Sequence, residues 1–353
     1  MYIILAILIF GILIASHELG HFLTAKACGV KVNEFAIGMG PKILKKQKGE
    51  TLYTLRLLPL GGFCAMEGED EASEDKRAFT SQSVSKRLLI LAAGAAMNFL
   101  VGLLIVLVLF ACLRPAYYVS NTVDSLEDAF RYGGENGIQP GDEILSIDGH
   151  RVFYGNDFTT YMDRAEGSVD MVVRRDGQRV KLEDYPLQRE EFLVDGETVL
   201  KYGINFDTIE PTFGEYLRHC LYTTWDFVRM VWMGLADLFG GNVGMKDMAG
   251  VVGIVDTISD VGNQSATTAD ALANIAYLGA FIAVNLAVMN LLPIPALDGG
   301  RIFFLLVTWG LEKLLRRKID PKYEGYIHAG GLVLLIGLMV VVMFNDIVRI
   351  ING

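Results

Sequence analysis

Long apolar stretches alternate with polar segments along this chain of 353 residues. A helix needs roughly 20 apolar residues to cross a bilayer. Four stretches meet that requirement, at residues 2–25, 88–113, 275–311 and 328–347. The third is too long for one span and contains Pro293 and Pro295, which interrupt a helical hydrogen-bond ladder. We therefore predict a membrane α-helical fold with about four transmembrane helices, in which an extended link divides the third stretch.

The polar segment between the first two spans contains two predicted strands, Val32–Ile37 and Thr51–Leu58. Apolar residues continue from the second strand through residues 59–63. A β element this apolar, placed between two spans, is predicted to be membrane-associated with its backbone covered by protein. Residues 1–114 are thus expected to form an N-terminal membrane core with two spans and a β-rich loop.

A different pattern begins after the second span. Residues 137–152 alternate apolar and polar positions up to an Asp-Gly turn at Asp148-Gly149, which is a hairpin signature. A second turn, Asp176-Gly177, separates Val169–Arg175 from Gln178–Leu182. A third Asp-Gly turn is predicted at Asp195-Gly196. These signals predict an inserted, mostly β domain over residues 115–208.

The remaining residues, 209–353, are expected to form an interfacial helix followed by the C-terminal membrane core with two spans. Residues 214–240 are apolar on one face but also carry charged side chains. A charged Arg or Asp at the bilayer centre costs roughly 2.5–3.5 kcal/mol, so an interfacial helix is favoured over a fifth span.

Lys and Arg accumulate in short cytoplasmic loops, so their positions predict the orientation of the chain. Basic residues lie between the first two spans (Lys42, Lys45, Lys46, Lys48, Arg56, Lys86, Arg87) and after the third (Lys313, Arg316, Arg317, Lys318, Lys322). Both loops are therefore expected in the cytoplasm. The two termini and residues 114–274 are then expected on the outer side.

Composition narrows the class of protein further. A hydrophobic content of 52% indicates an integral membrane protein, and a net charge of -10 argues against nucleic acid as a partner. The four cysteines lie far apart and are read as free thiols. Ala25-Lys26-Ala27 could be a signal-peptide cleavage site, but the basic n-region is missing, so we expect the first span to be retained.

The first span carries the motif His17-Glu18-Leu19-Gly20-His21. Residues four apart share a helix face, so both imidazoles can reach one metal ion at about 2.0–2.1 Å. Two histidines that only pack between helices are the alternative, but polar groups within a membrane are expensive and are functional candidates by default. The helix rise places His17 roughly 24 Å from an outer end at Met1, toward the cytoplasmic side.

A catalytic zinc ion usually has three protein ligands and one open position. Asp298 is the best candidate for the third ligand, because the prolines before it break the helix and can direct its carboxylate inward. The same residue could instead be the N-cap of the next helix, and His328 and Asp346 are weaker ligand candidates. Glu18 is the predicted general base for hydrolysis of a peptide bond.

A substrate at this depth would be another transmembrane helix, whose peptide bonds are protected until the helix unwinds. Asn98, Asn285 and Asn290 could hydrogen-bond the freed backbone groups, although each could instead join helices of the protein itself. An exposed edge of the loop strands could hold the unwound segment by strand addition.

These motifs together resemble the bacterial site-2 proteases of the RseP type along nearly the full chain. The resemblance rests on His17–His21, residues 33–41, residues 59–63, Gly94 with Asn98, and the stretch from Asn290 to Gly300. The string from Pro140 to Gly149 resembles the PDZ domains of bacterial proteases, so residues 115–208 are expected to be one PDZ-like domain.

The resemblance implies an intramembrane zinc protease of the bacterial cytoplasmic membrane, with Zn²⁺ held by His17, His21 and Asp298 and with Glu18 as catalytic base. It places Asn98 and Asn290 in substrate handling, and we include Pro293 with them. Single-span membrane proteins already cleaved by another protease, such as anti-sigma factors, or remnant signal peptides are the implied substrates. A catalytically silent PDZ scaffold and a metal transporter are the competing hypotheses, and the second would need ligands along a path across the membrane.

Overall fold

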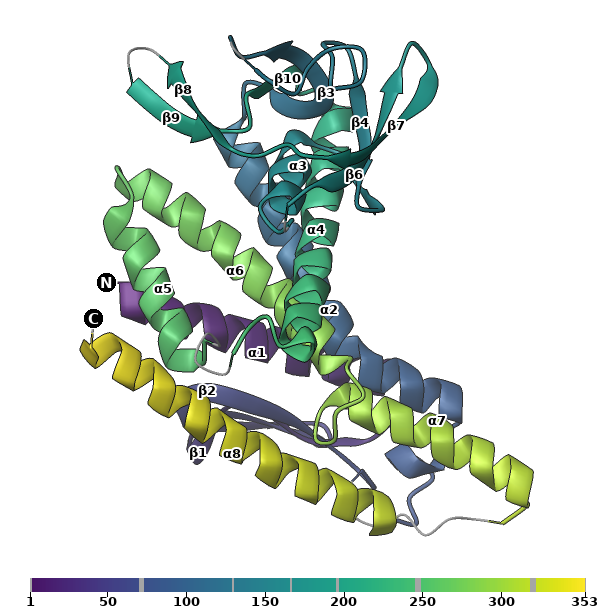
Figure 1. The fold of residues 1–353 in the computed structure, drawn as a ribbon. Helices are drawn as coiled ribbons and strands as arrows, with labels where there is room; N and C mark the ends of the chain where they lie inside the picture. Colours follow the sequence, from purple (N-terminus) through teal and green to yellow (C-terminus); the bar gives the residue numbers. More distant parts are fainter. Residues whose placement is uncertain are drawn as a thin grey trace. The chain divides into compact units, whose positions relative to one another are not determined.

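The protein is described here by a computed structural model that covers residues 2–69, 73–128, 130–165, 167–194, 197–244, 249–317 and 322–352 (Figure 1). Within these residues, four helices are long and apolar enough to cross a membrane. They are α1 (Tyr2–Ala27), α2 (Val84–Leu113), α6 (Thr268–Asn290) and α8 (Lys322–Asn352). The four predicted spans are therefore present as helices.

The chain divides into two compact units, Met1–Leu113 with His219–Gly353, and Arg114–Arg218. Besides its long helices, the first unit contains the short helix η1 (Phe79–Ser81), α5 (Val251–Gln264) and α7 (Asp298–Leu315). The helix α4 (Phe213–Gly240) begins in the second unit and continues in the first. As Pro293 and Pro295 led us to expect, residues 291–297 interrupt the helix between α6 and α7, but they form turns and bends and not the predicted extended link.

Glycines allow the long helices of the first unit to approach at backbone level. A Cβ added to Gly20 of α1 would stand 2.3 Å from the carbonyl oxygen of Ala93 in α2. A Cβ on Gly102 of α2 would stand 2.7 Å from Val284 Cγ2 in α6. Leu13, Ile258 and other buried apolar side chains fill the core between α1, α5 and α6.

The first unit also contains the sheet formed by β1 (Val32–Lys48) and β2 (Thr51–Met66). Phe35 is paired with both Cys64 and Tyr53, while Tyr53 is paired with both Phe35 and Lys46. Each strand therefore contributes two pairing segments, and the sheet runs in the order 42–48, 51–58, 32–39, 62–66. The segment 62–66 is one edge of this sheet, since it is paired on one side only within the described residues.

Hydrogen bonds to the Glu34 carboxylate connect three segments of this sheet. Glu34 accepts hydrogen bonds from Thr54 (2.7 Å), Lys42 (2.8 Å) and Arg56 (2.8 Å). Burial opposes ionisation of Glu34, but the three hydrogen bonds outweigh it and lower the pKa of this carboxyl to about 2.

The second unit contains a six-stranded sheet in the order β10-β3-β4-β6-β7, with β5 paired to β4. Its elements are β3 (Tyr118–Leu126), β4 (Glu143–Ile147), β5 (His150–Arg151), α3 (Gly155–Met162), β6 (Val169–Arg175), β7 (Gln178–Tyr185) and β10 (Ile204–Ile209). A separate hairpin joins β8 (Glu190–Val194) to β9 (Glu197–Lys201). The mostly β character predicted for this segment agrees with these elements.

Two of the predicted Asp-Gly turns are confirmed. Asp148 and Gly149 join β4 to β5, while Asp176 and Gly177 join β6 to β7. Both residues of each turn have positive φ, as a two-residue type I′ hairpin requires. The predicted turn at residues 195–196 lies outside the described residues.

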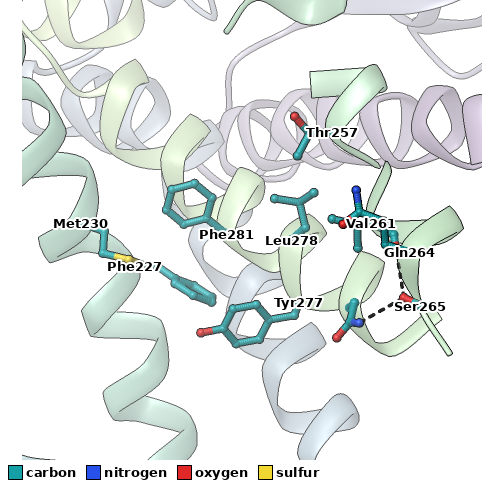
Figure 2. Close-up of a pocket in the computed structure, with 10 residues that line it drawn as sticks. Phe227, Met230, Thr257, Val261, Gln264, Ser265, Tyr277, Leu278 and Phe281 are labelled. Atoms are coloured by element: carbon teal, nitrogen blue, oxygen red, sulfur yellow. Dashed lines mark hydrogen bonds between the residues drawn. The ribbon is translucent and has the colours of Figure 1, made fainter. Parts of the chain in front are cut away.

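A cavity of about 530 Å³ is lined by residues of α4, α5 and α6 in the first unit (Figure 2). Phe227 packs edge-on against Tyr277 and Phe281 at ring-centroid distances of 5.1 and 5.5 Å. At another part of the lining, Asn274 Nδ2 donates to Ser265 Oγ at 3.2 Å. The described residues that line this cavity include no carboxylate, imidazole or thiol.

Candidate metal centre

Three predicted site residues meet in the first unit. His17 Nε2 lies 3.1 Å from His21 Nε2 and 3.1 Å from Asp298 Oδ2, and the distance from His21 Nε2 to Asp298 Oδ2 is 3.2 Å. The histidines are one turn apart on α1, and Asp298 is the first residue of α7. Among the described residues, this is the one such group of His, Cys, Asp or Glu that could hold a metal ion.

The geometry of these three atoms suits a small divalent cation. A triangle with sides of 3.1–3.2 Å has its centre about 1.8 Å from each corner, so an ion bound at about 2.0–2.1 Å would lie roughly 1 Å above it. Asp298 Oδ2 is buried and has no hydrogen-bond partner. A cation would satisfy this oxygen and leave a fourth tetrahedral position open.

Backbone contacts orient the imidazole of His21. Its Nδ1 lies 2.8 Å from the carbonyl oxygen of Ile90 in α2. Donation from Nδ1 to this carbonyl fixes the tautomer in which Nε2 carries a lone pair toward the triangle. The α2 backbone thus orients a candidate ligand provided by α1.

Gly94 of α2 lies against both imidazoles. A Cβ at this position would stand 2.4 Å from His21 Nε2 and 2.7 Å from His17 Nε2. These separations are far below an ordinary contact, so only a residue without a side chain leaves room for the two rings.

Asp298 reaches the histidines because the link 291–297 folds closely over the first turn of α7. A Cβ on Gly299 would stand 2.3 Å from the carbonyl oxygen of Leu291, and a Cβ on Gly300 would stand 2.2 Å from that of Ile294. The N-cap residue of α7 is Leu297, and it makes no side-chain capping bond. The alternative role of Asp298 as N-cap is therefore wrong in this structure, since Asp298 is the first helical residue.

Glu18 lies beside the triangle and faces β2. A Cβ added to Gly62 would stand 3.2 Å from Glu18 Cγ, and the backbone of Cys64 hydrogen-bonds the Glu18 carboxylate. Glu18 shares a cavity of about 570 Å³ with His17, His21 and Asp298. The four residues are therefore accessible from one space, and the Glu18 carboxylate lies next to a candidate metal position.

The family model for peptidase family M50 matches residues 5–338. This chain belongs to peptidase family M50.

Relatives of this M50 peptidase match over nearly their whole length. A Clostridium perfringens protein named as a provisional zinc metalloprotease is 36% identical over 99% of each chain. The zinc metalloprotease RasP of Bacillus licheniformis is 29% identical, with 99% of each chain covered. The regulator of sigma-W protease RasP of Bacillus subtilis is 28% identical, over 99% of this chain and 98% of the relative. The M50 peptidase is thus a membrane-embedded zinc metalloprotease of the site-2 type.

Of the other predicted site residues of the M50 peptidase, one lines the cavity and two do not. Asn290, the last residue of α6, lines the cavity. Asn98 is buried and accepts a hydrogen bond from Ser16 Oγ at 3.0 Å, which ties α2 to α1. Pro293 lies in the link and is not among the residues that line the cavity. Substrate handling by these three residues stays a prediction.

The two weaker ligand candidates have other partners. His328 Nδ1 accepts a hydrogen bond from the Ala296 backbone N–H at 3.0 Å. The carboxylate of Asp346 accepts from the backbone N–H groups of Gly250 and Gly253, each at 2.9 Å. Neither belongs to the metal-binding group of the described residues.

Several residues that line the cavity were not predicted from the sequence. Arg301 forms an ion pair with Glu69, and both side chains line the cavity. Arg301 follows Asp298 by three residues, so helical spacing could have placed it on the same face, whereas no pattern points to Glu69. Cys64 also lines the cavity, and burial raises the pKa of its thiol.

Proposed function

We propose that His17, His21 and Asp298 bind the zinc ion of this protease and that Glu18 is its general base. The observation that carries the proposal is the triangle of two imidazole nitrogens and one buried carboxylate oxygen beside Glu18, with sides of 3.1–3.2 Å. Two nitrogens and one oxygen with a free fourth position are the donor set of a catalytic zinc site.

Bound zinc would polarise the scissile carbonyl and lower the pKa of water to about 7. Glu18 takes a proton from the attacking water and passes it to the nitrogen of the leaving amine. The hydrogen bond from Cys64 to Glu18 holds the carboxylate next to β2, where the substrate would lie. Hydrolysis then breaks one peptide bond and adds one water across it.

For the substrate, we infer a transmembrane segment that unwinds before cleavage. The edge segment 62–66 of the β1–β2 sheet supports this, because Phe63, Cys64, Ala65 and Met66 line the cavity that contains Glu18. An unwound segment could add to this edge through backbone hydrogen bonds, and Asn290 could bind its remaining polar groups.

Membrane proteins trimmed by an earlier protease are the proposed class of substrate. This includes anti-sigma-factor-like proteins and remnant signal peptides, and the name of the Bacillus subtilis relative as a regulator of sigma-W supports the first group. The second unit, with its sheet and the helix α3, is proposed to be a PDZ-like domain that screens approaching substrates.

We also propose that both termini and the second unit lie outside the cytoplasm. Cys112 offers a test because it is exposed, whereas Cys28, Cys64 and Cys220 are buried. A membrane-impermeant maleimide added to intact cells should label the wild type and not Cys112→Ser. Labelling of Cys112 only after the membrane is permeabilised would reverse the orientation.

Cleavage of a single-span reporter tests the catalytic assignment. The chain is co-expressed with a tagged reporter whose outer domain is already trimmed, and Glu18→Gln, Asp298→Asn and wild type are compared at equal expression. Asp270→Asn is a matched control, because it makes the same carboxylate-to-amide change at an exposed hydrogen bond at the start of α6.

We expect cleavage by wild type and Asp270→Asn and none by Glu18→Gln. Asp298→Asn should lose both cleavage and zinc, because an amide is a poor zinc ligand. Cleavage by Glu18→Gln would eliminate Glu18 as the base. Wild type that binds the trimmed reporter without cleaving it would favour a silent scaffold.

A further inference from the structure

The link that precedes Asp298 contains a backbone conformation that side chains rarely adopt. Ala296 has φ of 77°, in the left-handed region. It is two residues before Asp298, and Ala296, Leu297 and Asp298 all line the cavity. The direction in which α7 leaves the link therefore depends on Ala296 remaining in this conformation.

One side chain from outside the link holds that conformation. The backbone N–H of Ala296 donates to Nδ1 of His328 at 3.0 Å, across 32 positions of sequence. This bond gives the Ala296 N–H an acceptor, and a backbone donor left without one is penalised in low-dielectric surroundings.

The rest of α8 brings His328 to this position. A Cβ added to Gly331, one turn after His328, would stand 2.3 Å from Pro295 Cβ and 2.9 Å from the Pro295 carbonyl oxygen. The His328 ring also packs edge-on against Phe304 of α7, with centroids 5.4 Å apart. The His328 imidazole is thus in contact with both the link and α7.

We propose that His328 is a positioning residue, which holds Ala296 in its left-handed conformation so that the Asp298 carboxylate faces His17 and His21. The proposal rests on the ligand set proposed above. His328 acts through the backbone of the link, since its Nδ1 accepts from Ala296 and it does not belong to the group of described residues that could hold a metal ion. Its replacement should therefore weaken zinc binding without removing a ligand.

Three variants separate this role from simple packing. His328→Leu keeps bulk and removes the acceptor, whereas His328→Asn keeps an acceptor oxygen near the position of Nδ1. Ala296→Gly, combined with His328→Leu, lets the link adopt positive φ without a steric cost. Tyr326→Leu is the matched control, since Tyr326 is an exposed residue of the same helix two positions away.

The measurement is the zinc dissociation constant of each purified full-length variant, obtained by competition with a chromogenic chelator, together with reporter cleavage. We expect His328→Leu to weaken zinc binding roughly 10-fold or more, as loss of an outer partner of a ligand does. His328→Asn should stay near wild type, and Ala296→Gly/His328→Leu should bind zinc more tightly than His328→Leu alone. Tyr326→Leu should match wild type.

A zinc dissociation constant of His328→Leu within twofold of wild type would overturn the proposal, as would a double variant no tighter than His328→Leu. If His328→Leu does not fold, His328→Asn decides: zinc affinity near wild type supports the positioning role, and a loss of 10-fold or more overturns it, because Asn keeps the acceptor. Asp298→Ala separates the ligand assignment from the role of His328. Unchanged zinc affinity in Asp298→Ala would show that Asp298 is not a ligand. Lost affinity in Asp298→Ala, with none lost in His328→Leu, would contradict only the positioning role of His328.

Discussion

Replacement of Gly94 by alanine is the sharpest test of how the metal centre is assembled. The new Cβ would stand 2.4 Å from His21 Nε2, 2.6 Å from His17 Cε1 and 2.7 Å from His17 Nε2. Ordinary contacts of a Cβ begin near 3.4 Å, so at least one ring must withdraw by about 1 Å. Zinc ligands tolerate deviations of roughly 0.2 Å, so this movement exceeds the tolerance several-fold.

We therefore expect Gly94→Ala to bind zinc at least roughly 100-fold more weakly than wild type, the upper end of what loss of an outer partner causes. Reporter cleavage should fall with it. The assay is the zinc dissociation constant and the zinc content of purified protein, with thermal unfolding measured in parallel to detect loss of fold.

Gly102→Ala is the matched control on the same helix. Its Cβ would stand 2.7 Å from Val284 Cγ2 and 3.1 Å from the Ala280 carbonyl oxygen, far from the metal position. This change should cost about 1–3 kcal/mol through overpacking and leave zinc affinity intact. Full zinc content and cleavage in Gly94→Ala, or equal zinc loss in both variants, would refute the reasoning.

Three further predictions follow from other contacts. Asp346→Ala should lower the free energy of unfolding by about 1–3 kcal/mol, because α5 loses the acceptor for the N–H groups of Gly250 and Gly253. Asp346→Asn keeps one acceptor oxygen and should lose less of this free energy; thermal unfolding measures both. The folded-state pKa of Glu34 lies below its ordinary value of 4.5. Ionised Glu34 therefore adds to the free energy of unfolding above pH 4.5, and this contribution is lost as the pH falls toward 2. The difference in melting temperature between wild type and Glu34→Gln should therefore be constant at pH 5–7 and should shrink as pH falls below 4.5; a constant difference at pH 3 would contradict this. A zinc chelator should abolish reporter cleavage, and added Zn²⁺ should restore it; cleavage that persists after zinc is removed would exclude a catalytic role for the metal.

Sequence patterns with a local physical cause predicted the structure well. The four apolar stretches are helices of spanning length, and Pro293 and Pro295 end one helix and precede another. Local i, i+4 spacing also brings the nitrogens of His17 and His21 to 3.1 Å. Periodicity and proline geometry act within a few residues, so they can be read without knowledge of tertiary contacts.

The extent of the β1–β2 sheet was underestimated for a physical reason. The predicted strands ended at Ile37 and Leu58, before glycine- and proline-containing segments, whereas the observed strands continue to Lys48 and Met66. Gly38, Gly40 and Gly61 have positive φ and absorb the register shifts, so the strands bend and continue. Helix α5 was also missed, because its first turn is capped by Asp346 from a distant helix.

The position of Asp298 depends on contacts that no local pattern encodes. The two histidines need only the regular geometry of α1, whereas the aspartate needs the link folded over Gly299 and Gly300 and the Ala296 backbone bound by His328. The motif Asp-Gly-Gly thus has a packing explanation. The Asp298 carboxylate can reach the histidines only because the two glycines that follow it leave room for the backbone of the link. Gly94 of α2 likewise leaves room for the imidazoles of His17 and His21. The geometry of the proposed metal centre should therefore respond more to added methyl groups at Gly94, Gly299 and Gly300 than to substitutions on the outer helix faces.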